Sequence, residues 1–503
     1  MKPSDELFNL IKNLTPAEKR FFRLQSQLQS GEKNYLHLFN AIDKEDEYDE
    51  ELIKKKLFRA RLVKDFSSEK NYLTALILKS LRIFHENSSD SIMLNNLQSE
   101  IEVTFQKGLY SLCAKLIKKL KTKALEQENF LVLLQAYSWE HRIRQTKTLT
   151  VSDTQNIIEK NIKEELNYAE KIIQIIKMKA ISARLSFARL TTGLPRTQED
   201  FEKYAQFIND PLLQIKKDSP FWLKIYYYSI YGLYYNIIEN LEEAYKVRKK
   251  SVELVEKNLS KVDLRLYIAT LINFLSILKK ESEYYNEFEV YLLKLKSLSG
   301  KNNIEMVMLS NAWTLEISKC IENKEFERAF SLIKPIEKNH HQFKAIYPLE
   351  HLIIDYYQFF YIHFIRAEYS RSLFWLNKIL NLKEEKRIRQ DIRSFSEIVK
   401  LVVHYELENY ELLPYITKST YRYFAKIKKT YRFETAFLSA VKKLCKMSDK
   451  NELLIILLQL KQELLQISED PLEKNVLKQF DFISWIDSKI SGKGFYEVIN
   501  EAH

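Results

Sequence analysis

The feature that most constrains this chain is its scarcity of residues that interrupt helices. Only 7 Gly and 9 Pro occur in 503 residues, in a chain rich in Leu, Ile, Lys and Glu. Strand-rich and doubly wound folds need many turns, so this composition predicts an all-α fold with short connections. The 30 Tyr and 29 Phe are expected mainly to fill the spaces between packed helices.

The stretch 219–258 predicts two antiparallel helices that cannot bury their apolar faces without neighbours. Ser219-Pro220 should start the first helix, with Ser219 as the cap and Pro220 at the first helical position. Gly232 would allow a second helix to approach closely, and Glu239-Asn240 would form the turn. Ala244 would then face back across the pair.

The same pattern recurs along the chain as a turn, an aromatic residue or Leu, and then a small or apolar residue. This last position falls at Cys113, Ala244, Phe288, Ala329, Ser372, Leu413 and Leu454. From Ala244 onward the spacings are 44, 41, 43, 41 and 41 residues. Six units in register predict a helix-pair repeat of about 42 residues, whereas residues 144–218 do not fit the register.

These helix pairs resemble the tetratricopeptide (TPR) repeat, which has a small residue within its first helix and an alanine early in its second. The resemblance covers roughly residues 104–468, with each helix about one turn longer than in a 34-residue TPR unit. The predicted repeat is similar to the long-repeat TPR-like solenoids of some bacterial regulators. The resemblance implies a right-handed superhelical solenoid of antiparallel helix pairs with a concave groove.

Four parts are expected along the chain. Residues 1–88 form a small N-terminal helical module, and 89–218 form the irregular first part of the helical repeat. Residues 219–468 form the regular solenoid, and 469–503 form a C-terminal capping helix and tail. The polar run 86–91 is the expected linker after the first module.

Two helix starts carry clear capping signals. In the first module Thr15 should cap a helix with Pro16 at its first position, and Glu18 completes a capping box. Near the chain end, Asp470-Pro471 should begin the capping helix, with Glu473 three residues after the cap.

The run LTPAEKRFFRL, residues 14–24, resembles the opening of a LuxR-type helix-turn-helix. The resemblance ends after these residues, because the following sequence lacks a recognisable recognition helix and is locally acidic. We therefore expect this module to bind a partner protein or to cap the repeat, with DNA binding as the lesser alternative.

No motif in the chain indicates an enzyme, a cofactor or a metal. There is no phosphate-binding GxxxxGK[ST] loop and no HExxH zinc motif. The best polar group consists of His340, His341, His351 and His363, with Asp355 one turn after His351. Metal binding or acid–base chemistry there is the alternative to a satisfied polar contact.

The cysteines and the apolar runs predict a soluble, cytoplasmic protein without a membrane span. The longest uncharged run, 225–238, has 14 residues, well short of the ~20 that cross a bilayer. Asp5 and Glu6 stand where a secretory leader would need basic and apolar residues. No disulfide framework or zinc pair is expected from the three separated cysteines, Cys113, Cys320 and Cys445.

Positive charge is concentrated between residues 414 and 447. This stretch has nine Lys or Arg and one Glu, a net +8 of the chain's +12. The predicted basic stripe consists of Lys418, Arg422, Lys426, Lys429 and Arg432. It could hold a phosphate backbone, dock an acidic protein or serve as a solvated face, and the sequence leaves these three readings open.

The tyrosine-rich helix after Pro220 is the predicted lining of a partner groove, with its opposite stripe exposed. The candidate groove residues are Tyr227, Tyr231, Tyr234 and Tyr235. The favoured function is a non-catalytic scaffold that binds a peptide or helical segment of a partner protein. The alternative is a nucleic-acid-associated or regulatory protein that uses the basic stripe at 418–446. An enzyme with a site around His351 and Asp355 is the third choice.

Overall fold

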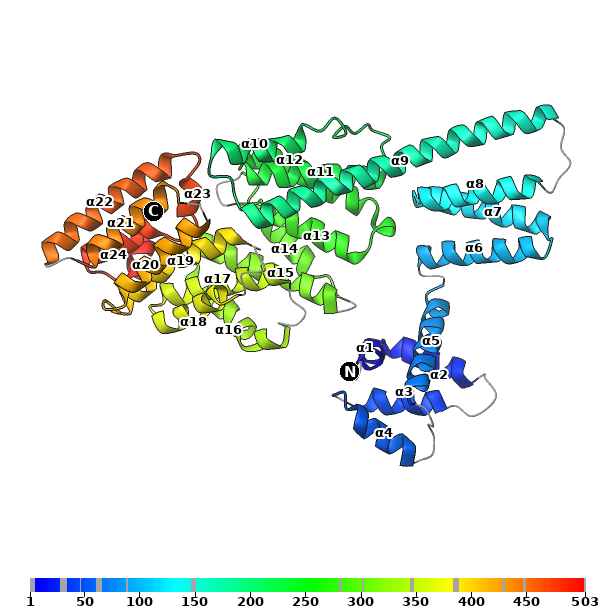
Figure 1. Cartoon of the computed structure of the whole chain (residues 1–503), viewed down its shortest axis with the longest axis horizontal. Helices are drawn as coiled ribbons and strands as arrows, with labels where there is room; N and C mark the ends of the chain where they lie inside the picture. The colour runs from blue at the N-terminus through cyan, green and yellow to red at the C-terminus, as the bar shows by residue number, and fades with distance from the viewer. Residues whose placement is uncertain are drawn as a thin grey trace. The chain divides into compact units, whose positions relative to one another are not determined.

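The computed structural model describes residues 5–27, 34–45, 47–59, 66–86, 89–145, 151–279, 283–300, 303–343, 348–382, 389–427, 430–446 and 449–501. These ranges are helical without any strand, and successive helices pack in neighbouring pairs, so the all-α prediction is confirmed (Figure 1). The chain divides into two compact units, Met1–Ile173 and Gln174–His503. This division coincides with none of the predicted boundaries, and the four-part organisation stays a prediction.

The first unit has its own core beneath α1 to α5, centred on Leu38, Phe39 and Ile77. The capping box at α2 is confirmed, because the Thr15 N–H donates to Glu18 at 2.7 Å and the Glu18 N–H donates to Thr15 Oγ1 at 3.3 Å. The helices are α1 (Glu6–Lys12), α2 (Pro16–Gln27), α3 (Asn34–Lys44), α4 (Glu50–Arg59), α5 (Phe66–Phe84), α6 (Asp90–Gln106), α7 (Tyr110–Glu126), α8 (Phe130–Gln145) and α9 (Val151–Thr192), which continues into the second unit.

The described part of the second unit consists of helices and includes one 3₁₀ turn, Leu259–Lys261. No helix in the described ranges has both the length and the apolar character needed to cross a bilayer. The helices are α10 (Gln198–Ile208), α11 (Phe221–Ile237), α12 (Leu241–Glu256), α13 (Leu264–Leu275), α14 (Glu287–Lys296), α15 (Asn303–Glu322), α16 (Phe326–Phe343), α17 (Leu349–Ile365), α18 (Tyr369–Leu380), α19 (Gln390–Glu406), α20 (Leu413–Ile427), α21 (Arg432–Leu444), α22 (Lys450–Glu469), α23 (Lys474–Leu477), α24 (Phe482–Ser491) and α25 (Phe495–Glu501).

One turn geometry recurs between helices. A residue with left-handed backbone closes the first helix at Gly108, Glu128, Glu239, Lys324, Ala367 and Glu408, with φ between 53° and 69°. The N–H of the next residue donates to the carbonyl five positions earlier at 2.7–3.0 Å, as Asn240 does to Tyr235. This Schellman arrangement satisfies carbonyls that the helix end leaves free. The same backbone arrangement therefore reverses the chain at six places within the described ranges.

The sequence register matches five of these six turns. Five residues after each of the six left-handed residues stands a side chain that is 3 % exposed or less: Cys113, Leu133, Ala244, Ala329, Ser372 and Leu413. Only Leu133 lies outside the register. The Ser372 hydroxyl donates to the Phe360 carbonyl at 3.0 Å, and the Cys113 thiol makes the equivalent contact with Ile101 at 3.5 Å. Phe288 is also buried, whereas Leu454 is 40 % exposed. The register therefore fails at its last position.

The α11–α12 pair differs from the prediction at its start. Pro220 takes the N-cap position of α11, and the Ser219 hydroxyl instead accepts the Lys216 N–H at 2.8 Å. At Gly232 the space for a side chain is filled by the buried Arg248 of α12. A Cβ at Gly232 would lie 2.5 Å from Arg248 Nε. Any larger residue at position 232 would therefore require the Arg248 side chain to move.

The C-terminal segment also differs from the prediction. The single helix expected from Asp470-Pro471 is replaced by α23, α24 and α25. Glu473 does not complete a capping box with Asp470. Its carboxylate accepts the N–H groups of Arg432 and Phe433 at 2.9 and 3.0 Å, and so caps α21.

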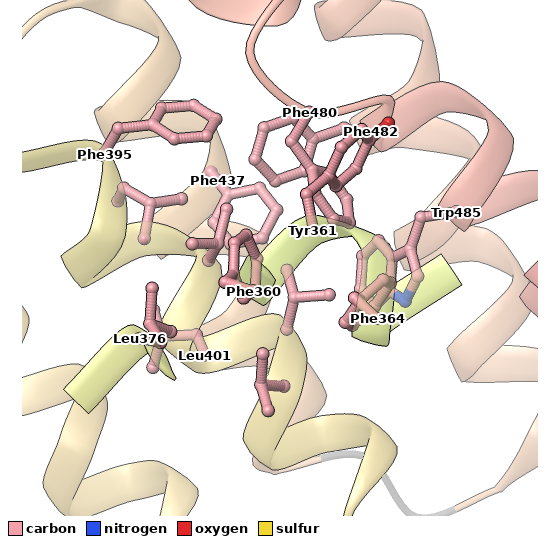
Figure 2. Packing of buried hydrophobic residues seen from close by; sticks show 14 of the residues in the cluster. Phe360, Tyr361, Phe364, Leu376, Phe395, Leu401, Phe437, Phe480, Phe482 and Trp485 are labelled. Carbon is pink, nitrogen blue, oxygen red and sulfur yellow. The ribbon is translucent and has the colours of Figure 1, made fainter. Parts of the chain in front are cut away.

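Aromatic side chains fix this C-terminal segment in the core. Phe480 and Phe482 pack beside Phe364 of α17 and Phe437 of α21, with ring centroids 5.0–5.1 Å apart (Figure 2). Trp485 of α24 contacts Phe437 as well. The segment is therefore part of the core that includes α17 and α21, and not only a cover for the last helix pair.

We predict that Gly232→Ala destabilises the protein, because the added methyl group overlaps Arg248 and the buried side chain must move. Overpacking of this kind costs about 1–3 kcal/mol. Urea unfolding measures the change, and the cost should be smaller in an Arg248→Ala background. The control is Gly494→Ala, where the nearest atom to a new Cβ is 3.9 Å away. Equal midpoints for Gly232→Ala and the parent protein would contradict this packing.

Candidate functional site

A cavity of about 670 Å³ lies between α14, α15, α16 and α17. Pockets of this size accommodate small molecules or large side chains. Its mouth reaches the surface at Met306 and Trp313, which are 55 % and 42 % exposed. Most of the wall is apolar and includes Leu295, Leu298, Met306, Val307, Leu309, Ala312, Trp313, Pro335 and Ile336. The cavity is therefore a hydrophobic recess that is open to solvent.

Asp355 of α17 brings a carboxyl group into this apolar wall. Its side chain is 5 % exposed, and Thr314 Oγ1 of α15 donates to Asp355 Oδ1 at 3.0 Å. In the part of the chain that the structure describes, Asp355 has no ion pair and no other hydrogen-bond donor. Burial raises the pKa of this carboxyl to about 7, and the Thr314 hydrogen bond offsets only part of that effect. A buried group with such a shifted pKa in a cavity is typical of binding and active sites.

The surroundings hold Asp355 in place. One turn further along α17, Gln358 Nε2 donates to the Thr314 carbonyl at 2.8 Å and to Ser318 Oγ at 2.7 Å. These bonds join α17 to α15 beside the Asp355 contact. The Asp355 carboxyl group is therefore held in position by contacts between α17 and α15.

A cation also lines the cavity, but it already has a counter-ion. Lys296 of α14 forms an ion pair with Glu316, and its Nζ lies 5.0 Å from the ring centroid of Trp313. Glu316 also accepts a bond from Arg328 at 2.9 Å. The charge of Lys296 is thus neutralised, whereas an ionised Asp355 has no counter-ion among the residues that the structure describes.

The structure separates the histidine group that the sequence suggested. His363 lies between Glu337 and Glu368 at 3.1 and 2.6 Å, as a satisfied polar contact. His351 and Asp355 form no hydrogen bond among the described residues, and burial lowers the pKa of His351. Those residues also contain no cluster of three metal-binding side chains. His340 and His341 lie on α16, and the structure describes only the backbone of these two residues.

The predicted groove tyrosines are partly covered by the protein itself. Tyr227, Tyr231 and Tyr234 pack against the core that α11 shares with α9 and α10, and Tyr235 packs against the core of α12 to α14. No residue of α11 is exposed, so the expected exposed stripe on its opposite side was wrong. A role for these tyrosines in partner binding stays a prediction.

The basic stripe is divided between two helices. Lys418, Arg422 and Lys426 are exposed on α20, and Lys418 and Arg422 form no ion pair with any described residue. Arg432 belongs to α21 and donates to Gln466 at 2.5 Å. Tyr415 and Tyr421 are exposed on the same helix as the three cations. One member, Lys429, lies outside the described residues.

A second basic feature is absent from the sequence-based prediction. A cavity of about 390 Å³ is lined by the lysines of the loop before α11, of α11 and of α12: Lys216, Lys217, Lys224, Lys250 and Lys257. None of these lysines forms an ion pair with the residues that the structure describes. They are scattered over 42 sequence positions, and no local pattern would have joined them.

Trp313 and Thr314 are also missing from the prediction, although a signal for Thr314 exists. Thr314 and Asp355 are 41 residues apart, the same spacing as in the helix-pair register. Residues one period apart face each other when successive helix pairs stack. A search for polar residues at that spacing would therefore have paired them.

No protein-family model matches the chain, and comparisons with curated proteins and with solved structures found no match. The TPR resemblance therefore remains an interpretation of the sequence pattern. The geometry of the second unit must carry any functional argument.

We predict that Asp355→Asn stabilises the protein more at pH 8 than at pH 5. The ordinary pKa is 3.8 and the folded value is about 7, so between these values the folded state holds the proton more tightly than the unfolded state. The titration of Asp355 therefore lowers the free energy of unfolding of the parent protein as the pH rises from about 4 to about 7, and has no further effect above pH 7. Because asparagine does not titrate, the stabilisation of Asp355→Asn relative to the parent protein should be about 2–3 kcal/mol larger at pH 8 than at pH 5.

Urea unfolding at pH 5 and pH 8 measures this difference. The matched control is Asp218→Asn, which removes an exposed carboxyl group outside the cavity. A gain at Asp355 that is the same at both pH values would show that its carboxyl titrates normally.

Proposed function

We propose that the protein is a non-catalytic interaction protein that binds a peptide or helical segment of a partner protein. The recurrent turn and the buried position five residues after it support a TPR-like solenoid in the second unit. Stacked helix pairs of this kind present extended surfaces to peptides. The free cysteines fit a reducing compartment such as the cytoplasm.

The observation that carries this proposal is the apolar cavity between α14 and α17. Tryptophan is enriched among the residues that anchor partner proteins, and Trp313 stands partly exposed beside the apolar cavity. By contrast, Phe480 and Phe482 already cover parts of α17 and α21. We therefore place the partner segment at the cavity, with one of its side chains inside.

We predict that Trp313→Ala weakens binding of selected peptides at least about tenfold, the effect expected for an anchor residue. Libraries of extended and of helix-forming peptides, selected on the whole protein, supply the ligands, and fluorescence polarisation measures the affinities. Phe187→Ala on α9 is the control, because Phe187 is another exposed aromatic residue outside the cavity. Peptides that bind both variants equally would place the interaction elsewhere.

A second candidate function is nucleic-acid binding by the exposed face of α20. The observation that favours it is the alternation of Lys418, Arg422 and Lys426 with exposed Tyr415 and Tyr421 on one helix. Such a face combines cations for phosphates with rings on which bases stack.

For this second function we predict micromolar or tighter binding of labelled oligonucleotides that weakens steeply with salt, because phosphate contacts release counterions. Fluorescence anisotropy across a salt series measures it. Lys418→Glu, Arg422→Glu and Lys426→Glu in one chain should abolish binding, whereas Lys442→Glu and Lys443→Glu on α21 should weaken it less. Absence of binding at low salt would remove this candidate.

A further inference from the structure

We infer that the Asp355 cavity binds a cationic group on an apolar stem, a primary ammonium or a guanidinium, with the Asp355 carboxylate as its counter-ion. The ligand chemistry comes from the cavity itself. Only its source, a lysine or arginine side chain of a partner segment, rests on the proposed function. The same chemistry in a free amine is the other source.

The first step of the argument is a comparison with other buried carboxylates of the second unit. Asp391 Oδ2 lies 2.9 Å from Arg389 Nη2, and Glu434 Oε1 lies 2.5 Å from Arg196 Nη1. Burial alone would raise the pKa of Asp391, but the Arg389 guanidinium lowers it to about 2. The chain thus supplies a cation where it buries these carboxylates, whereas Asp355 has only the Thr314 hydroxyl among the described residues.

The second step concerns the cost of that arrangement. A buried carboxylate without a counter-ion is expensive, and the group avoids the cost by keeping its proton. A cation that enters the cavity would supply the missing partner and form a charge-assisted hydrogen bond. The binding free energy would therefore come from an interaction that the empty protein lacks.

The third step concerns the walls. Met306, Leu309, Trp313 and Ile336 form an apolar lining around the polar end. Lysine and arginine bury their methylene stems along such surfaces while the charged group finds a polar partner. The ring of Trp313 is one such surface. An anionic ligand would meet the carboxylate, and a hard metal ion would need more oxygen ligands than Asp355 and Thr314 provide.

The test titrates the whole protein at pH 8 by calorimetry with hexylamine, hexanol and hexanoate, which share one stem and differ in their end group. We expect hexylamine to bind at least about tenfold more tightly than hexanol, and hexanoate not to bind. Asp355→Asn should remove the preference for the amine, and Asp218→Asn should keep it. Thr314→Val, which leaves the carboxylate in place, should also keep it. Circular dichroism checks that each variant is folded.

Equal affinity for hexylamine and hexanol, or a preference for the amine that persists in Asp355→Asn, would overturn the inference. Peptide libraries with a fixed central lysine, arginine or norleucine then identify the source. Enrichment of lysine or arginine peptides that depends on Asp355 supports a partner side chain.

The remaining outcomes separate the inference from the proposed function. Equal enrichment of norleucine peptides that depends on Trp313 would leave the proposed function standing and overturn the cationic ligand. Amine binding without enrichment of any peptide would support the inference with a free amine and overturn the proposed function. If neither amines nor peptides bind, both are wrong.

Discussion

The second unit depends on the packing of its C-terminal aromatic residues against α17 and α21. Phe480, Phe482 and Trp485 are each 1 % exposed, and burial of an aromatic side chain contributes roughly 1.5–3 kcal/mol. Without them, apolar parts of both helices would face water. Glu473, just before this segment, caps α21 and accepts a bond from Arg196 at 3.0 Å. One short segment therefore supports a helix start, a core and a contact with the loop before α10.

Local chemistry made much of the fold predictable. The few glycines and prolines indicate helices, and the register coincides with five turns that share one backbone hydrogen bond. Long-range contacts were not predictable in this way. The expected exposed stripe of α11 is covered because α9 packs on it. The hydroxyl groups of Ser182 on α9 and Ser229 on α11 lie within 3.4 Å of each other. Helix α9 comes from a stretch that did not fit the register. The Glu473 carboxylate likewise accepts hydrogen bonds from N–H groups 40 and 41 positions away, and not from the expected cap three positions before it.

In the candidate site, too, the long-range contacts could not be predicted from the sequence. The sequence drew attention to Asp355 only through His351, and the structure replaces that pairing with Thr314 and an apolar cavity. Because burial raises its pKa, this carboxyl group reduces stability at neutral pH. Groups with pKa values perturbed in this way cluster at functional sites. The basic residues of α20 carry no comparable cost, because exposed lysines are well solvated. The cavity is therefore the stronger of the two indications of a binding site.

Contacts between distant parts of the second unit affect how it folds during synthesis. Lys478 pairs with Glu239 at 3.1 Å, and Arg196 pairs with Glu473 at 3.0 Å, across 239 and 277 positions. In an open repeat array each unit touches only its neighbours and can fold as it leaves the ribosome. Here α17 and α21 cannot complete their core until Phe480 and Phe482 have been made. The nascent chain therefore carries the exposed aromatic surface of α17 from its synthesis until Phe480 and Phe482 have been made, and exposed surface of this kind makes incomplete chains prone to aggregation.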